Sequence, residues 1–265
     1  MTSSPSRWLR CYRPRPPAAA KLICFPHAGG AASAYRAWQD RTGQAVELHA
    51  VQYPGREDRL GEPFIDRMDT LVEEIVAALA TVALGRFAFF GHSMGGAVAH
   101  EVALRLRALG LAEPEHLFIS GRQPPRHHRG GILHTRDDRA VVDELVRLKP
   151  TNAELMAEPD LAAIVLPVVR NDYRLIETYR PTTAAPLRCP ITALVGEDDT
   201  ELTVAQAADW AECTEGRMRL HTFPGDHFYL VEQRDSVIDI VLDELRPGPR
   251  PSTYVPQLDD GGAHR

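Results

Sequence analysis

The 265-residue sequence predicts one large α/β domain with a mainly parallel sheet that helices cover on both faces. Short apolar runs such as "KLICF" and "FAFFG" are bounded by Gly, Pro or charged residues, as strands are. They alternate with stretches whose apolar residues recur at helical spacing. Strands and helices in alternation build parallel sheets covered on both faces. The 44% hydrophobic content is enough for a sizeable core.

Taken in order, the chain begins with a short strand around Trp8 to Tyr12 and a Pro-rich loop, which together occupy residues 1–20. The core is predicted in two pieces, 21–122 and 182–245. Its strands are expected at 21–25, 46–51, 87–91, 116–121, 191–196 and 217–223. Residues 246–265 combine proline, glycine and charge without any period, which predicts a disordered tail.

Two core helices have recognisable ends. "DTLVEEIVAALATVA" contains Thr70 and Glu73 at the spacing of a capping box. "AVAHEVALRLRALG" ends on Gly110, which suits the left-handed position after a helix. We therefore expect both segments to pack as amphipathic helices against the sheet.

The alternation stops in residues 123–181. This segment contains the amphipathic "DDRAVVDELVRLK" and the longer apolar "PDLAAIVLPVVRNDYRLIETYR", with no convincing strand. A helical insertion between two strands of such a sheet lies over their carboxyl ends, where ligands bind. The segment is predicted to be a helical lid.

Charge and composition exclude several classes of protein. A net charge of −6 and a pI near 6.0 argue against nucleic acid or an anionic membrane as partner. "MTSSPSRWLR" has no apolar segment typical of a signal peptide, and "LAAIVLPVV" is shorter than the ~18 residues of a membrane span. The chain shows no metal-binding spacing, so no metal and no cofactor are expected. A soluble cytoplasmic protein is predicted, with free thiols at Cys11, Cys24, Cys189 and Cys213.

The segment Gly91-His92-Ser93-Met94-Gly95 matches the G-x-S-x-G pattern of a nucleophile elbow. It follows a predicted strand and opens a predicted helix, as that turn requires. Glycine is needed on either side because a Cβ would collide with the adjoining strand or helix. Ser93 is thus the candidate nucleophile, held at a helix N-terminus that favours developing negative charge.

A serine hydroxyl needs a base, and in this architecture the acid and then the histidine follow the serine. His227 comes after the turn "PGD" at the end of the last strand, whereas His221 lies inside that strand, so His227 is favoured. Asp199 follows the strand 191–196 in a G-x-x-D arrangement, with Asp198 as its close rival.

Two backbone N–H groups should stabilise the oxyanion. One belongs to Met94, the residue after the nucleophile, and the other is expected at Ala28 in the loop "PHAGG" after the first core strand. Gly29 and Gly30 let this backbone turn inward. For His27 we favour a packing or hydrogen-bonding role in the loop over metal binding or a second base.

These segments, together with "QYPGRE" (52–57), "GEDD" and "GDHFYL" in this order, make residues 20–245 resemble the type II thioesterases of polyketide and nonribosomal peptide synthases. The resemblance implies an α/β-hydrolase fold and a triad of Ser93, Asp199 and His227. It also implies hydrolysis of stalled or aberrant acyl groups from phosphopantetheine arms of carrier domains, by a monomer. Expected substrate contacts are Gly29, His92, Arg122, Leu161 and Val165.

Several alternatives stay open. An acyltransferase, a product-releasing cyclase or a general esterase would use the same triad, and a noncatalytic receptor is a third class. The apolar face with Leu161 and Val165 could line a passage or pack in the core. Arg122, Arg126 and Arg129 could contact a carrier domain or form a solvated loop.

Overall fold

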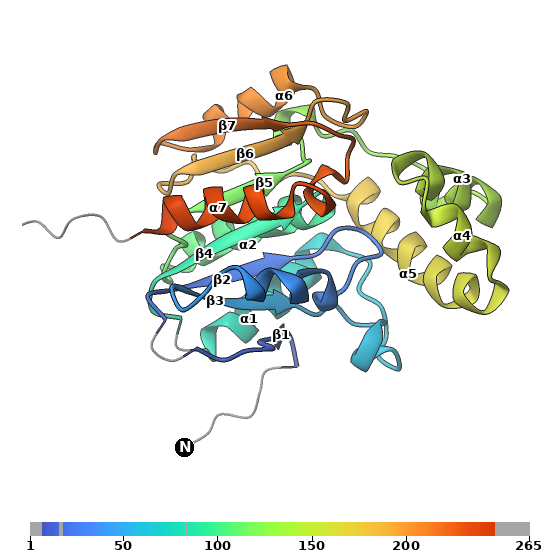
Figure 1. Cartoon of the computed structure of the whole chain (residues 1–265), viewed down its shortest axis with the longest axis horizontal. Coiled ribbons are helices and arrows are strands. Elements are labelled where there is room, and N and C mark those ends of the chain that lie inside the picture. Colours follow the sequence, from blue (N-terminus) through green and yellow to red (C-terminus); the bar gives the residue numbers. More distant parts are fainter. Residues whose placement is uncertain (1–6, 16–17, 83, 247–265) are drawn as a thin grey trace, which may run out of the picture.

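The computed structural model describes residues 7–15, 18–82 and 84–246, and these contain a seven-stranded sheet (Figure 1). The strand order is β1-β3-β2-β4-β5-β6-β7, and every neighbouring pair is parallel except β1 with β3. The strands are β1 Leu9–Arg10, β2 Ala20–Phe25, β3 Val46–Val51, β4 Phe87–His92, β5 Leu117–Ser120, β6 Ile191–Gly196 and β7 Met218–Phe223. The predicted strands are thus confirmed, whereas the predicted tail lies outside the described residues from position 247 onward.

Alternate residues of the strands pack in two separate hydrophobic cores, one on each face of the sheet. On β2, Ile23 and Phe25 pack in the core that includes the helices α1 (Met68–Ala80) and α2 (Met94–Ala108). Leu22 and Cys24 face the opposite side, where η1 (Ala32–Asp40) and α7 (Arg234–Leu245) contribute to a second core. Both faces of the sheet are therefore covered, which explains the nearly continuous apolar strands.

The helix ends agree with the sequence in one case and differ in the other. The Gly110 backbone is left-handed (φ 65°), and the N–H of Leu111 donates to the Leu106 carbonyl at 3.0 Å, as in a Schellman motif. The predicted capping box of Thr70 and Glu73 is wrong. Helix α1 begins at Met68, two residues before Thr70, so Thr70 lies inside the helix and not at its cap. Arg67 precedes the helix without a side-chain cap, and the Glu73 carboxylate pairs with Arg105 of α2 at 2.7 Å.

The segment 123–181 is helical throughout its regular structure. It contains η3 (Pro125–His127), η4 (Leu133–Thr135), α3 (Asp138–Leu148), α4 (Asn152–Ala157) and α5 (Pro159–Thr178). Figure 1 shows α3, α4 and α5 grouped together at one end of the sheet. Helix α4 was not predicted, because six residues are too few to display a period. The remaining short helices are η2 (Glu57–Arg59), α6 (Val204–Ala208), η5 (Asp209–Cys213) and η6 (Tyr229–Val231).

The loops that follow the carboxyl ends of β2, β4, β6 and β7 carry the predicted chemical groups. Ala28 follows β2, Ser93 follows β4, Asp199 follows β6 and His227 follows β7. Because parallel strands end at the same edge, all four loops open toward one side of the sheet.

Two further expectations concern thiols and membranes. Cys11, Cys24, Cys189 and Cys213 are all free, as predicted. Within the described ranges, no helix has both the length and the apolar character needed to cross a membrane.

Candidate active site

Ser93 occupies a sharp turn between β4 and α2. Its backbone lies at φ 53° and ψ −121°, a conformation that costs energy for a residue with a side chain. The turn depends on close backbone approach at both flanking glycines. A Cβ on Gly91 would lie 2.6 Å from the Gly96 nitrogen, and one on Gly95 would lie 2.6 Å from the Pro26 carbonyl oxygen. The predicted elbow is therefore present, with Ser93 at the start of a helix.

His227 and Asp199 form a buried hydrogen-bonded pair. The imidazole Nδ1 lies 2.9 Å from Asp199 Oδ2 and 3.1 Å from Oδ1, so Nδ1 is the donor in this pair. The Asp199 carboxylate also accepts the Glu201 N–H at 2.8 Å, which fixes its orientation. The rival residues are placed differently: Asp198 is exposed, and His221 lies within β7.

Ser93 and His227 line one cavity of about 370 Å³ between the sheet edge and the helical insertion. We call it the serine chamber. The insertion contributes Leu133, Leu148, Tyr173 and Ile176 to its wall. The Ser93 hydroxyl makes no hydrogen bond among the described residues, so its hydrogen bond to His227 is not formed in this structure. Catalytic hydrogen bonds are often long without substrate and shorten when substrate binds.

Two backbone N–H groups of the serine chamber are free to donate. Within the part of the chain that the structure describes, neither the Ala28 nor the Met94 N–H has a hydrogen-bond partner, although both residues line the chamber. Met94 is the first residue of α2, where N–H groups have no acceptor within the helix. The chamber thus brings together a serine hydroxyl, an imidazole and two free N–H donors, the groups that acyl transfer at a serine requires.

Two predicted substrate contacts face elsewhere. The Gly29 N–H donates to the Asp172 carboxylate at 2.8 Å, and Gly29 lines a separate groove beside His27. His92 is fully buried, with Nδ1 2.9 Å from the Ser120 hydroxyl and its ring centroid 5.0 Å from that of His227. Burial, followed by the nearby His227 and His27, holds the His92 pKa well below its usual range. The prediction that His92 contacts substrate is therefore wrong, since it packs behind the imidazole.

The face of α5 that the sequence predicted to contact substrate does not line the serine chamber. Val165 lines the separate groove with Gly29, and Leu161 is 43% exposed and lines neither space. Tyr173 and Ile176 of the same helix line the chamber instead. At 1.5 Å per residue, Leu161 and Ile176 are about 22 Å apart along the axis, so only the carboxyl-terminal half of α5 reaches the serine.

The three arginines of "GRQPPRHHR" have different surroundings. Arg122 lines the serine chamber, where its Nη2 lies 2.8 Å from His128 Nδ1, and burial lowers its pKa to about 10. Arg129 also lines the chamber. Arg126 instead forms ion pairs with Asp209, at 3.3 Å, and with Glu212, so it attaches this loop to η5.

His27 lies in the loop after β2, next to the serine chamber rather than in it. Its ring packs edge-on against Phe228, with centroids 5.1 Å apart. Burial, and then the charge on His227, lowers its pKa to about 4, so its imidazole is neutral at neutral pH. This geometry is that of a packing residue.

Sequence reasoning assigned no role to Arg56 or Asp172, although both are buried next to the loop that carries Ala28. Arg56 belongs to "QYPGRE", so the motif itself was a usable signal. Asp172 had none, because a polar residue in an amphipathic helix predicts a solvent-facing position.

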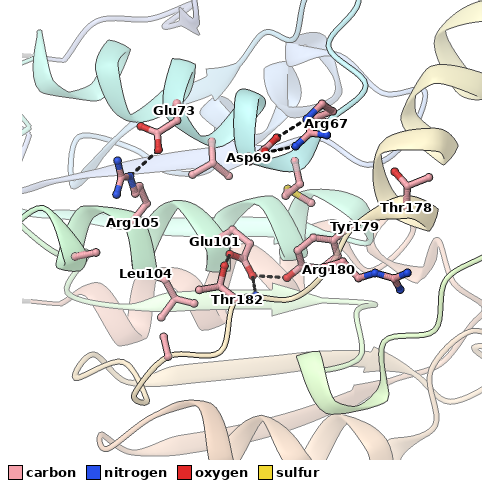
Figure 2. A pocket seen from close by; sticks show the side chains of 14 residues that line it. Arg67, Asp69, Glu73, Glu101, Leu104, Arg105, Thr178, Tyr179, Arg180 and Thr182 are labelled. Atoms are coloured by element: carbon pink, nitrogen blue, oxygen red, sulfur yellow. Dashed lines mark hydrogen bonds and ion pairs between the residues drawn. The ribbon is translucent and has the colours of Figure 1, made fainter.

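A larger cavity, of about 490 Å³, lies between α1, α2 and the segment after α5, and contains none of the triad residues (Figure 2). Its buried carboxylate, Glu101, accepts hydrogen bonds from the Tyr179 hydroxyl and from the Thr182 N–H and hydroxyl. These bonds fasten the carboxyl-terminal end of the helical insertion to α2. The buried carboxylate of this cavity therefore has partners within the protein itself.

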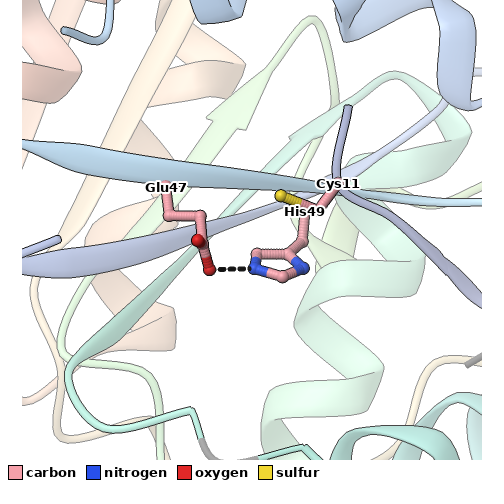
Figure 3. A group of neighbouring side chains, drawn as sticks. All are labelled: Cys11, Glu47 and His49. Atoms are coloured by element: carbon pink, nitrogen blue, oxygen red, sulfur yellow. Dashed lines mark hydrogen bonds and ion pairs between the residues drawn. The ribbon is translucent and has the colours of Figure 1, made fainter. Parts of the chain in front are cut away.

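Cys11, which follows β1, lies beside Glu47 and His49 of β3 (Figure 3). Glu47 Oε1 is 2.7 Å from His49 Nε2, and its Oε2 accepts the Arg15 N–H at 2.6 Å. Burial, with the Glu47 charge, raises the pKa of the Cys11 thiol to about 11. Both Glu47 carboxylate oxygens are hydrogen-bonded within the protein, and the Cys11 thiol is protonated at neutral pH. These contacts explain the cluster as part of the sheet edge.

The elbow, the chamber and the strand order together define an α/β-hydrolase fold with a serine at the turn where this fold carries its nucleophile. Residues 20–245 match the thioesterase domain family, and the chain belongs to that family of hydrolases acting on thioesters.

Three similar proteins are named as thioesterases. The probable cadicidin biosynthesis thioesterase of Streptomyces griseus is 41% identical over 91% of this chain and 67% of its own length. Thioesterase PikA5 of Streptomyces venezuelae is 38% identical over 90% of this chain and 85% of its own. The solved type II thioesterase BorB from the borrelidin biosynthetic cluster superposes with a TM-score of 0.84, at 40% identity, over 90% of this chain and 98% of its own.

Proposed function

We propose that this thioesterase hydrolyses acyl groups from the phosphopantetheine arms of carrier domains, and so clears stalled or aberrant acyl chains from a polyketide or nonribosomal peptide synthase. The observation that carries the proposal is the serine chamber, in which Ser93, His227 and two free N–H groups meet under a helical cover. The relatives named for such pathways support the choice of substrate. In this role the enzyme would act as a monomer in the cytoplasm, with a carrier domain as its transient partner.

The mechanism uses each group of the chamber once per half-reaction. His227 Nε2 takes the Ser93 proton as Oγ attacks the thioester carbonyl, and the Ala28 and Met94 N–H groups stabilise the oxyanion. Collapse of the tetrahedral intermediate expels the pantetheine thiolate, which takes the proton back from His227. His227 then activates water, which cleaves the acyl-serine to a free acid and restores Ser93. Asp199 holds the imidazole in the required tautomer.

The helical insertion is proposed to be a lid that limits which acyl groups reach the serine. It supplies one wall of the 370 Å³ chamber, through Leu133, Leu148, Tyr173 and Ile176. Arg122 and Arg129 line the same chamber and could meet the pantetheine phosphate or polar acyl groups. Arg126 is excluded from this proposal because its guanidinium is already paired.

The test is a turnover panel of acyl groups, from acetyl and propionyl to longer chains, each carried on an acyl carrier protein and on free coenzyme A. The proposal predicts release of the free acid, a preference for the carrier-bound form, and no turnover by Ser93→Ala. Product analysis also separates hydrolysis from acyl transfer, because transfer would give an ester or amide. Equal rates with carrier and free coenzyme would remove the carrier domain as partner.

A further inference from the structure

A buried ion pair joins the lid helix α5 to the loop before η2. Arg56 Nη1 donates to Asp172 Oδ2 at 2.6 Å, and Nη2 donates to Oδ1 at 2.7 Å, so the pair is bidentate. Arg56 is 5% exposed and Asp172 is 2% exposed. Such a pair is stable only where the remaining polar atoms also find partners.

Those partners belong to the loop that carries Ala28. Asp172 Oδ2 accepts the Gly29 N–H at 2.8 Å, and Arg56 Nη1 donates to the Gly30 carbonyl at 3.0 Å. Val169, one turn before Asp172 on α5, packs so closely that a Cβ on Gly29 would be 2.9 Å from its Cγ2. The backbone at Gly29 and Gly30 is therefore held directly by the lid helix and by Arg56.

The remainder of "QYPGRE" holds the same loop on either side of these glycines. The Tyr53 hydroxyl donates to the Pro26 carbonyl at 3.2 Å. The Gln52 side chain accepts the Ala32 N–H at 2.9 Å and donates to the Arg56 carbonyl at 3.0 Å. The motif thus fixes both ends of the loop 26–32, while the ion pair fixes its centre.

Ala28 lies between these fixed points, and its N–H is the free donor in the serine chamber. The Ala28 N–H shares a planar peptide group with the His27 carbonyl, which accepts the Gly30 N–H at 2.9 Å. The orientation of this group is therefore restrained by the contacts that hold the Gly30 carbonyl and the Gly29 N–H. The carboxylate that holds it is part of α5 and stays in place only while this helix is seated on the core.

We propose that Arg56 and Asp172 are positioning residues that orient the Ala28 N–H toward the oxyanion and make this orientation depend on the seating of the lid helix. The inference rests on the proposed oxyanion role of Ala28. It assigns to "QYPGRE" a function in the reaction rather than in carrier recognition. When the lid helix is not seated on the core, the Ala28 N–H is misplaced and the hydrolase is poorly active. Acyl chains that the lid does not accept are therefore hydrolysed slowly.

The test compares two double variants that differ in whether residue 172 can accept the Gly29 hydrogen bond. Arg56→Met with Asp172→Leu removes both charges and the acceptor for Gly29, whereas Arg56→Met with Asp172→Asn keeps an amide oxygen at that position. Replacing both members of a buried ion pair with groups of similar volume is often neutral for stability. The matched control is Arg174→Gln, which breaks the 3.1 Å pair between α5 and Asp66 but leaves the Ala28 loop untouched.

The readouts are kcat and KM for p-nitrophenyl acetate, and affinity for a trifluoromethyl ketone whose oxyanion occupies the hole. We expect the Met/Leu variant to lose about 10- to 100-fold in kcat and in ketone affinity, with KM within about twofold, since one oxyanion donor is worth ~10²–10³. The Met/Asn variant should recover most of this loss, and Arg174→Gln should keep the wild-type kcat.

Wild-type kcat and ketone affinity in a folded Met/Leu variant would overturn the proposal, as would an equal loss in Arg174→Gln or no recovery in a folded Met/Asn variant. Melting temperatures establish which variants are folded. Because the assay uses a small ester, an absence of carrier preference would contradict the proposed function without affecting this result.

Discussion

Gly95→Ala should inactivate the enzyme by moving the loop that carries Ala28, although the substitution adds only a methyl group. Its Cβ would overlap the carbonyl oxygen of Phe25 and lie 2.6 Å from that of Pro26, whereas ordinary contact begins near 3.4 Å. Both obstacles are backbone atoms, so α2 and the end of β2 must separate by about 1 Å. A misplacement of that size can cost ~10² in rate.

The assay measures kcat on a small aryl thioester together with the melting temperature. We expect kcat to fall about 100-fold and stability to fall by about 1–3 kcal/mol, as overpacking usually causes. Gly61→Ala is the control, because Gly61 is exposed and its Cβ would meet nothing within 4 Å. Wild-type kcat and melting temperature in Gly95→Ala would refute the claim that this close approach sets the oxyanion geometry.

Three further predictions address the acid, the buried histidines and the chamber. Asp199→Asn should lower kcat by ~10⁴ through loss of the imidazole orientation, whereas Asp198→Asn should change kcat by no more than a few fold in the same assay. A loss below tenfold in Asp199→Asn, together with a severe loss in Asp198→Asn, would assign the acid role to Asp198. Burial lowers the pKa of His100 to about 4, below its unfolded value of 6.5, so the unfolded chain binds more protons between these values and the unfolding free energy should fall as pH drops from 6.5 to 4. Urea denaturation at pH 7 and 4.5 measures this fall, which His100→Gln should reduce; an undiminished fall in the variant would assign the acid sensitivity to other groups. Leu148→Trp, which narrows the serine chamber, should lower kcat/KM for octanoyl at least tenfold relative to acetyl, and equal effects on both acyl groups would show that the acyl chain lies elsewhere.

The strands and the elbow could be predicted because their signals are local. Each strand is a short apolar run with its own boundaries, and the Ser93 turn needs glycine at Gly91 and Gly95 for close approach that the pattern itself encodes. The loops of His227 and Asp199 could be predicted from the order of strands, since each follows a strand at the same sheet edge, and the G-x-x-D arrangement favoured Asp199 over Asp198.

What could not be predicted depends on contacts between distant segments. Thr70 and Glu73 have the spacing of a cap, but Glu73 instead pairs with Arg105 on the neighbouring helix. Arg56 and Asp172 are 116 residues apart in sequence, and nothing in either local pattern indicates that they meet. The residues of α5 that line the chamber depend on where the helix crosses the sheet edge, which its period alone does not determine.

The central claim is that Ser93 carries the acyl group during turnover. It is tested most directly by quenching the reaction with an acylated carrier protein within milliseconds and locating the acyl mass by peptide mass spectrometry. The account predicts an acyl adduct on the peptide containing Ser93 that decays as free acid forms, and it predicts that His227→Ala forms the adduct far more slowly. Release of acid at the wild-type rate by Ser93→Ala, or an adduct that forms only on another residue, would contradict it.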